Sequence, residues 1–379
     1  MPNRWRLLSQ GRRVVAVPLM MWADDVSGNN SKKFNKHNIM CASNLSRPRK
    51  QLEEEHNIMF LGATKTALPV EMAGGYMTML DELFSKGGIA FDPSTREELC
   101  FFAWPAIFAG DNPLQSELCS HRGPGANALC RICLVYGTQA EKRSEEGFAR
   151  LFEIGTPRTP KETLQSIDAM LDLSVKCGTT ARINKIKTEK GVTDKLAEPV
   201  LLALRQTIKT HSKSAQARDE LETKLKAQFI SMRGAEAKNN VNPHQQTPVE
   251  PLHTVDLGMV KYLWSKTCDL LAPNAKKKDD RIPRRPVEGT PMSLVLQRLD
   301  GLNREGWGAL EFEPDYFCQY RGALNGKHFR ALVHSMPFVL WDLITPDLLE
   351  AWVTLGLTCP MVYNGEILDK DRNDVRLFY

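Results

Sequence analysis

The chain contains 379 residues, of which 42% are hydrophobic, so it is long enough to bury a full core and to form two or three domains. Its 50 Lys and Arg residues exceed its 45 Asp and Glu residues by only five, which excludes a strong global field and does not establish a nucleic-acid partner. The nine Cys residues are irregularly spaced, which excludes a small disulfide scaffold and favours a reducing compartment. The sequence has no run of about 18 apolar residues, which argues against a membrane protein, and no apolar core of a signal peptide, which argues against a secreted one.

The first strong pattern is the apolar run VVAVPLMMW at residues 14–22, which predicts a central strand that is covered on both faces. Two acids, Asp24 and Asp25, follow this strand almost directly. The polar residues 28–37 come next, and they predict either a loop that contacts phosphates or a solvated turn. The lysines that would make these phosphate contacts are Lys32, Lys33 and Lys36.

Three further strands and one helix complete a series. Residues 39–42 and 58–61 predict strands, residues 69–85 predict a helix between a proline and a glycine pair, and residues 101–109 predict a buried strand. The turn after this last strand carries Asp111, which is either a metal ligand or an ordinary turn residue. The order strand, strand, strand, helix, strand is that of an RNase H-like mixed sheet in the α/β class.

In an RNase H-like core, the ends of the first and fourth strands lie side by side and hold two divalent cations. Mg²⁺, or Mn²⁺ in its place, is bound by carboxylates and water, and two ions about 3.5 to 4 Å apart stabilise the attacking and leaving oxygens of a phosphoryl displacement. One of Asp24 and Asp25, together with Asp111, would bridge such ions. A third acid normally completes the site.

Four soft ligands lie in two close pairs soon after this turn. Cys119 and His121 form a Cys-x-His pair, and Cys130 and Cys133 form a Cys-x-x-Cys pair eight residues later. This spacing suits a tetrahedral structural Zn²⁺, which would make residues 111–137 a zinc-binding element. The alternative is a set of scattered buried thiols without a metal.

Beyond residue 137 the sequence becomes mostly helical and charged. We therefore divide the chain into an RNase H-like portion with its zinc-binding element at residues 1–137, a charged helical insertion at 138–247 and a mostly helical region at 248–379. Each of three Thr-Pro pairs predicts the start of a helix in these last two segments. The threonines are Thr159, Thr290 and Thr345.

Two polar features stand out in the last segment. Glu250 and His253 are spaced so that their side chains meet if the turn between them is helical, and otherwise His253 simply caps or packs the following helix. The basic residues of 276–285 predict a nuclear-localisation patch, a phosphate contact or an exposed linker.

Three stretches together resemble a known family. ADDVSGNNSKKFNKHN at 23–38, GDNPLQSELCSHRGPGANALCRIC at 110–133 and PVEPLHTVDLGMVKYLW at 248–264 are similar, in order and spacing, to Plavaka-type transposases of fungi. These form a branch of the CACTA, or En/Spm-like, DDE transposases. The resemblance runs from about residue 10 to the end of the chain.

The resemblance implies an RNase H-like fold, two-metal cleavage and transfer of DNA strands, a DNA partner, a nuclear location and, at full length, a possible assembly of identical chains. Asp25 matches the first acid because Ser27 and Gly28 follow it, with Asp24 as the runner-up, and Asp111 matches the second acid. The family carries its metal-binding cluster and an acid-x-x-His motif at matching places. These places are occupied by Cys119, His121, Cys130 and Cys133, and by Glu250 and His253.

The third acid has no convincing match before Tyr379, although Glu350 and Glu366 stand at suitable positions. We therefore interpret the chain as a partial transposase, from a decayed copy or a truncated gene model, and expect it to bind DNA weakly without cutting it. The alternative function is a non-catalytic remnant of a transposable element that binds zinc and either DNA or protein.

Overall fold

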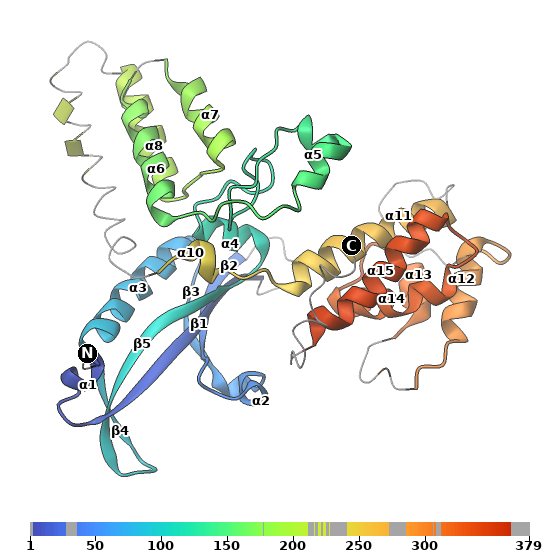
Figure 1. Ribbon diagram of the computed structural model, residues 1–379, viewed down its shortest axis with the longest axis horizontal. Coiled ribbons are helices and arrows are strands. Elements are labelled where there is room, and N and C mark those ends of the chain that lie inside the picture. The colour runs from blue at the N-terminus through green and yellow to red at the C-terminus, as the bar shows by residue number, and fades with distance from the viewer. Residues whose placement is uncertain are drawn as a thin grey trace. The chain divides into compact units, whose positions relative to one another are not determined.

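The computed structural model divides into two compact units, Met1–Pro248 and Val249–Tyr379 (Figure 1). The structure describes residues 3–27, 36–176, 178–210, 241–272, 286–305, 307 and 312–364, with six scattered positions between 216 and 227. The second unit starts at Val249, one residue after the start of the predicted last segment at 248. The division after residue 137 stays a prediction.

A five-stranded mixed sheet forms the base of the first unit, which confirms the predicted α/β class. The strands are β1 (Arg13–Ser27), β2 (Lys36–Asn44), β3 (Ile58–Thr64), β4 (Gly88–Asp92) and β5 (Glu97–Ala109). In space they run in the order β3, β2, β1, β5, β4. β1 is parallel to β5, and the other neighbouring pairs are antiparallel.

β1 is central in this sheet, as its apolar sequence predicts. Successive side chains of a strand alternate between its two faces, so Leu19, Met21 and Ala23 share one face. All three are buried there. Met20 and Trp22, on the opposite face, are only half-buried. The second face of β1 is therefore less completely covered than the apolar run predicts.

The pairing of β1 with β5 contains one bulge. Leu19 lies opposite Pro105, but the next residue, Met20, lies opposite Ile107, so Ala106 is the extra residue. Because a shift of one residue exchanges the two faces of a strand, the bulge decides which β5 side chains face the core beyond it. It places Phe108 opposite Met21, where both are buried.

Helix α3 (Pro69–Lys86) covers the face of the sheet that carries Leu19 and Met21. Proline at the first position suits the start of a helix, and the carboxylate of Glu71 accepts a hydrogen bond from the Leu68 N–H at 2.7 Å. Gly87, with a φ of 78°, ends the helix in a conformation that favours glycine. The predicted helix is thus confirmed with its start and end signals.

The short strand β4 was not predicted. It forms an antiparallel hairpin with the start of β5, so β5 begins at Glu97 and not at Phe101 as the sequence analysis expects. The polar residues 94–98 hide this hairpin from a search for apolar runs. Two apolar side chains of β4, Ile89 and Phe91, remain exposed.

Helices make up most of the rest of the first unit. They are α1 (Arg4–Leu8), α2 (Arg49–Leu52), η1 (Glu55–Asn57), α4 (Asn112–Leu118), η2 (Glu141–Arg143), α5 (Glu145–Arg150), α6 (Pro160–Ser174), α7 (Thr180–Lys190), α8 (Ala197–Thr210) and α10 (Pro243–Gln246). Helices α6, α7 and α8 share a second core around Ile167, Ile183 and Leu204. Thr159 caps α6 as predicted, because its hydroxyl accepts a hydrogen bond from the Glu162 N–H.

The second unit is helical. It consists of the π-helix η3 (Leu252–Val260), α11 (Lys261–Leu271), α12 (Pro291–Asp300), α13 (Pro314–Gln319), α14 (Gly326–Val339) and α15 (Pro346–Tyr363). Its core surrounds the buried indole of Trp352, whose Nε1 donates to Thr267 Oγ1 at 3.0 Å. Helices α12 and α15 begin after Thr290 and Thr345, as predicted.

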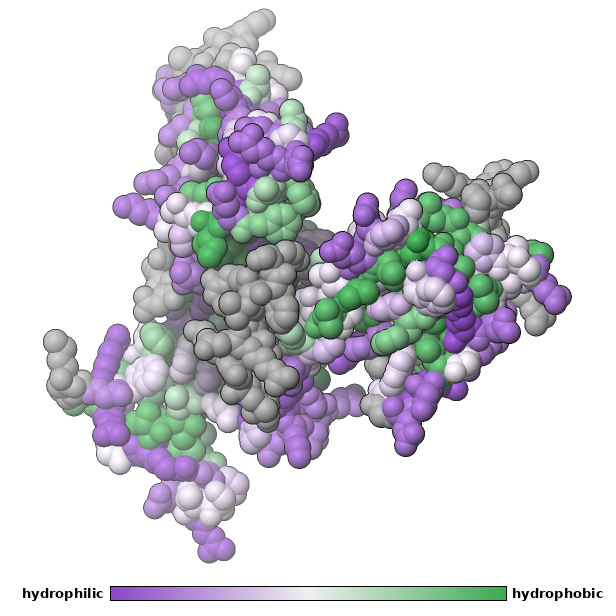
Figure 2. Space-filling view, turned by 45° about the vertical axis from the view of Figure 1, so that its right-hand side comes forward, coloured by the Kyte–Doolittle hydropathy of each residue, from purple (hydrophilic) through white to green (hydrophobic). Residues whose placement is uncertain are grey.

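The surface of this second unit mixes apolar and polar side chains, shown in green and purple in Figure 2. Tyr262, Phe338, Trp341 and Leu357 are among its exposed apolar residues. In the described part of the chain, no helix combines the length and the apolar character that crossing a membrane requires.

Replacing Phe102 by Ala should destabilise the sheet by about 3 to 5 kcal/mol, the usual cost of a cavity left by a buried phenylalanine. Phe102 is 0% exposed, and its ring stacks on Trp5 with the ring centroids 5.0 Å apart. Hydrogen exchange of the β5 amides measures this change. In the matched control Phe91→Ala the side chain is 64% exposed, so a change below about 0.5 kcal/mol is expected. Equal effects in the two variants would contradict the assignment of the core.

Candidate functional site

The ends of β1 and β5 lie at the same edge of the sheet because the two strands are parallel neighbours. Their last paired residues are Trp22 and Ala109. Gly110 follows, and a Cβ built on it would lie 3.5 Å from the Ala23 carbonyl oxygen and 2.4 Å from Leu114 Cδ2. The two backbones therefore stay together beyond the last pair, and a larger residue than glycine at position 110 would have to displace the Leu114 side chain.

Asp24 and Asp25 differ in their surroundings. By strand alternation Asp25 belongs to the face of Met21 and Ala23, and Asp24 belongs to the opposite face. The Asp24 Oδ1 atom accepts a hydrogen bond from the Asp25 N–H at 2.8 Å. Both residues are exposed at the edge of the sheet that also carries the β5 end.

Asp111 has a structural role at that edge. It caps α4, because its Oδ1 atom accepts a hydrogen bond from the Leu114 N–H at 2.7 Å. Leu114 is buried in the core between the sheet and α3. This cap fixes the carboxylate beside the strand end, and among the described residues its Oδ2 atom has no hydrogen-bond partner.

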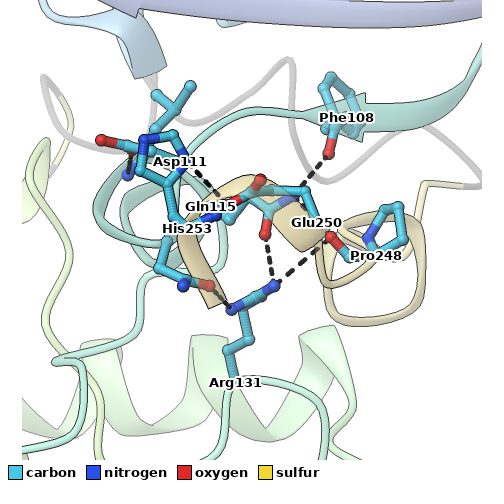
Figure 3. A network of polar contacts seen from close by, with 9 residues as sticks. Phe108, Asp111, Gln115, Arg131, Pro248, Glu250 and His253 are labelled. Carbon is cyan, nitrogen blue, oxygen red and sulfur yellow. Dashed lines mark hydrogen bonds and ion pairs between the residues drawn. The ribbon is translucent and has the colours of Figure 1, made fainter. Parts of the chain in front are cut away.

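A clamp made of Gln115 and Arg131 supports the loop behind this edge (Figure 3). Gln115 is 0% exposed, and its Nε2 atom donates to the Pro248 carbonyl at 2.7 Å and to the Phe108 carbonyl at 3.4 Å. Arg131 donates to the Gln115 Oε1 atom and, at 3.0 Å, to Asn112 Oδ1. The clamp thus joins β5, α4 and the Cys130 to Cys133 loop, and nothing in the sequence pattern indicates it.

Two of the predicted zinc ligands are buried and engaged within the protein. The Cys119 thiol lies 3.2 Å from Thr247 Oγ1 and 3.4 Å from the Pro243 carbonyl. His121 Nε2 donates to the Ala128 carbonyl at 3.1 Å, and its Nδ1 accepts from the Gly123 N–H at 3.0 Å. Burial, the largest cause, lowers the pKa of His121 to about 4, so the ring is neutral at pH 7.

The other two predicted ligands are half-buried. The Cys130 sulfur accepts a hydrogen bond from the Ile132 N–H at 3.4 Å, and Cys133 lies on the same loop. Within the residues that the structure describes, no three His, Cys, Asp or Glu side chains are gathered closely enough to hold a metal ion. The predicted ligands therefore share one region without forming a ready ligand shell.

Arg158 is a buried cation of this region that sequence reasoning missed. The side chain is only 4% exposed, and its guanidinium donates to the carbonyls of Cys130, Ala128 and Lys190 at 2.8, 2.9 and 2.9 Å. Burial, the largest cause, lowers its pKa, and the nearby Cys130, Cys133 and Cys119 act in the opposite direction when their thiols are ionised. A lone arginine before Thr159 carries no signal of such a role in the sequence.

Glu250 and His253, in the second unit, form a pair. The Glu250 Oε1 atom accepts hydrogen bonds from the His253 N–H at 2.7 Å and from its Nδ1 at 2.8 Å (Figure 3). This arrangement orients the imidazole and assigns the proton to Nδ1, which leaves the lone pair on Nε2. Of the two alternatives predicted for these residues, the structure shows the one in which their side chains meet.

A second polar group of the helical unit was not predicted. Asp256, on η3, is 5% exposed and accepts a hydrogen bond from the Tyr363 hydroxyl. The Arg330 guanidinium lies over the Tyr363 ring, 4.0 Å from its centroid. Burial raises the pKa of Asp256. The group ties the start of the unit to the end of α15.

Several predicted positions cannot be placed. Lys32, Lys33, Glu366 and the basic residues 276–285 lie outside the described residues. The backbone of Lys36 pairs with Ser27 at the start of β2. Glu350 lies exposed on α15.

Comparison of the chain with protein-family models found no match, and neither did comparison with curated proteins.

Replacing Arg158 by Ala should destabilise residues 128–133 by about 3 kcal/mol or more, because three carbonyls lose the donor that this buried side chain supplies and its removal leaves a cavity. Lys at position 158 can donate to only some of the three carbonyls, so an intermediate loss of stability is expected. Hydrogen exchange across this loop measures both. The matched control is Arg150→Ala, which removes an exposed ion pair with Glu141 at 3.5 Å and should cost less than about 0.5 kcal/mol. A protein that loses Arg158 without faster exchange would contradict the role assigned to it.

Proposed function

We propose that the chain is the catalytic region of a DDE-type DNA transposase, with an RNase H-like core that carries two of the acids. The observation that supports this most is the parallel pairing of β1 with β5. It brings the strand ends that carry Asp25 and Asp111 to one edge of the sheet.

The order of the elements also supports the proposal. The chain runs through β1, β2, β3 and α3 to β5, and β1 lies between β2 and β5 in the sheet. This is the arrangement that the RNase H-like interpretation requires. The hairpin strand β4, inserted before β5 at the sheet edge, is an addition to it.

Asp25 and Asp111 would hold divalent cations at this edge, with Asp24 as the alternative first acid. When bound, two Mg²⁺ or Mn²⁺ ions would supply charge stabilisation for in-line displacement at a DNA phosphate. The Asp111 cap fixes one carboxylate oxygen and leaves Oδ2 to face a cation. A third carboxylate is needed for a complete site, and the candidates in this chain are Glu250, Glu350 and Glu366.

DNA is the proposed partner, bound through its phosphates. Lys32, Lys33 and Lys36 follow the first acid in sequence, where their charges would neutralise phosphates near the edge. Such binding weakens steeply with added salt, because it releases counterions. The nuclear location and the assembly with further copies at full length are proposed on the resemblance alone.

A structural Zn²⁺ is proposed for Cys119, His121, Cys130 and Cys133. Three thiols and an imidazole are donors that zinc prefers, and the buried guanidinium of Arg158 would offset the negative charge of metal-bound thiolates. Binding requires one ring nitrogen of His121 to exchange its present partner, either the Gly123 N–H or the Ala128 carbonyl, for the metal.

The second candidate function is a non-catalytic remnant that binds zinc and either DNA or protein. Two observations favour it. The Oδ1 atom of Asp111 already serves as a helix cap, and the part of the chain that the structure describes contains no group of three acids placed around a metal position.

Replacing either Asp25 or Asp111 by Asn should weaken Mn²⁺ binding at least about tenfold, because each variant removes one anionic ligand from the pair. Asn keeps the hydrogen bond that caps α4, so Asp111→Asn separates metal binding from helix stability. Mn²⁺ titration followed by electron paramagnetic resonance measures the affinity.

Asp24→Asn is the matched control, and it should leave Mn²⁺ affinity within about twofold of the parent. A larger loss of Mn²⁺ affinity in this control than in Asp25→Asn would identify Asp24, and not Asp25, as the first acid. Unchanged binding in both Asn variants of the proposed pair would refute the metal site. Duplex DNA with Mg²⁺ or Mn²⁺ should remain uncut, and nicking that disappears in Asp111→Asn would show that Glu250, Glu350 or Glu366 completes the site.

Purified protein should contain about one zinc per chain, as expected for a closed four-ligand site. Cys130→Ser should lose the metal and lower the melting temperature, whereas Cys41→Ser, which changes a buried thiol of β2, should keep the metal. Elemental analysis and thermal denaturation measure these outcomes. A Cys130→Ser protein with its metal and melting temperature intact would rule the site out.

A further inference from the structure

An apolar groove lies between α3 and the sheet, at the end opposite to Asp25 and Asp111. It has a volume of about 410 Å³. Its floor includes Leu19 and Ala42 from the two central strands, and Met79 and Leu83 from α3 form one wall. Most of its lining is apolar, with Asn44, Arg47, His56 and Asn57 as its polar members, so apolar side chains of a partner would readily displace water from it.

The groove exists because α3 covers only part of the sheet. The helix packs mainly along β5, with fewer contacts to β2, and it leaves the edge strand β3 less covered. Met79 on α3 is 63% exposed, and Met59 on β3 is 43% exposed. These two flexible side chains therefore face the opening, where unbranched thioethers can adapt to varied apolar partners.

One end of the groove is closed and the other is open. Tyr76 closes the end toward the acids, since its hydroxyl donates to the Leu61 carbonyl at 2.6 Å across from α3 to β3. Arg47 lies at the open end and is exposed. Among the described residues no carboxylate pairs with Arg47, whereas its neighbours Arg49 and His56 each have one, at 3.0 and 3.4 Å.

The dimensions of the groove match a short helix. Along β1, the lining from Val17 to Met21 spans about 13 Å at about 3.3 Å per residue. Along α3, the lining from Tyr76 to Leu83 spans about 10 Å at about 1.5 Å per residue. Two turns of a helix occupy about the same length, which places three or four apolar side chains over the groove.

We propose that this groove binds an amphipathic helix of a partner protein, with an apolar stripe about two turns long and a carboxylate that pairs with Arg47. The apolar lining provides the affinity, and the unpaired cation at the open end fixes the direction and register of the helix. The proposal does not rest on the transposase assignment, because the groove shares no residue with the acidic edge.

The probe is a synthetic 14-residue amphipathic helix with Leu on one face and Glu at one end of that face, and its twin carries Lys in place of Glu. Fluorescence anisotropy with the full chain should show saturable binding of the Glu peptide. Met79→Glu should weaken this binding about tenfold or more, since it places a charge in the apolar contact. Arg47→Glu should weaken the Glu peptide and strengthen the Lys twin.

The matched control is Phe91→Glu, which introduces the same charge at a residue of β4 that is 64% exposed and outside the groove. It should bind the Glu peptide like the parent. No saturable binding, equal binding by Met79→Glu, or equal loss in the Phe91→Glu control would overturn the proposal. Sedimentation that shows self-association of the parent, abolished by Met79→Glu, would also overturn it by assigning the groove to a second copy of the chain.

Discussion

Parallel pairing of β1 with β5 is the constraint on which the first unit depends. Two parallel strands cannot be joined by a tight turn, so the chain must leave β1, build β2, β3 and α3, and return before β5 can pair. That return buries α3 against the sheet and sends both strands out at one edge. The segment that directly follows β5, which contains Asp111 and α4, is therefore anchored beside the end of β1. The chemistry proposed for this edge is a consequence of the pairing and not of any single side chain.

The bulge at Ala106 shows how finely this pairing is set. Without it, Phe108 would point to the opposite face of the sheet. The register of β5 against β1 would also shift by one residue, and Gly110 would no longer lie against Ala23 and Leu114. Glycine at 110 admits the close approach, and Asp111 then caps α4 directly afterwards. The bulge at Ala106, the glycine at 110 and the helix cap at 111 thus follow one another within six residues, and together they hold the Asp111 carboxylate in place.

The sequence predicts the elements that have a local cause. Apolar runs mark β1 and β5, and Thr-Pro pairs mark the starts of α6, α12 and α15. It does not reveal β4, which is only five residues long and is separated from the apolar run of β5 by the polar residues 94–98. It also misses the clamp of Gln115 with Arg131 and the three carbonyls around Arg158, because these contacts join residues that are far apart in the chain. Single polar residues carry no periodicity, so only the folded chain shows which of them are buried together.

The π-helix η3 gives the second unit a sensitivity to chain length. Gly258 lies close under the His253 carbonyl, where a Cβ would approach the oxygen to 2.7 Å, and these two residues are separated by the five positions of π-helical hydrogen bonding. Loss of one residue from this segment would restore α-helical spacing and turn the helix residues just before the deletion by about 100° around the helix axis. Glu250 and His253 would then face another direction, and Val255 and Asp256 would turn with them, although Val255 is buried in the core around Trp352 and Asp256 accepts from the Tyr363 hydroxyl. The direction of the Glu250–His253 pair is therefore tied to the packing of the helical core, so a change in the length of this helix alters both together.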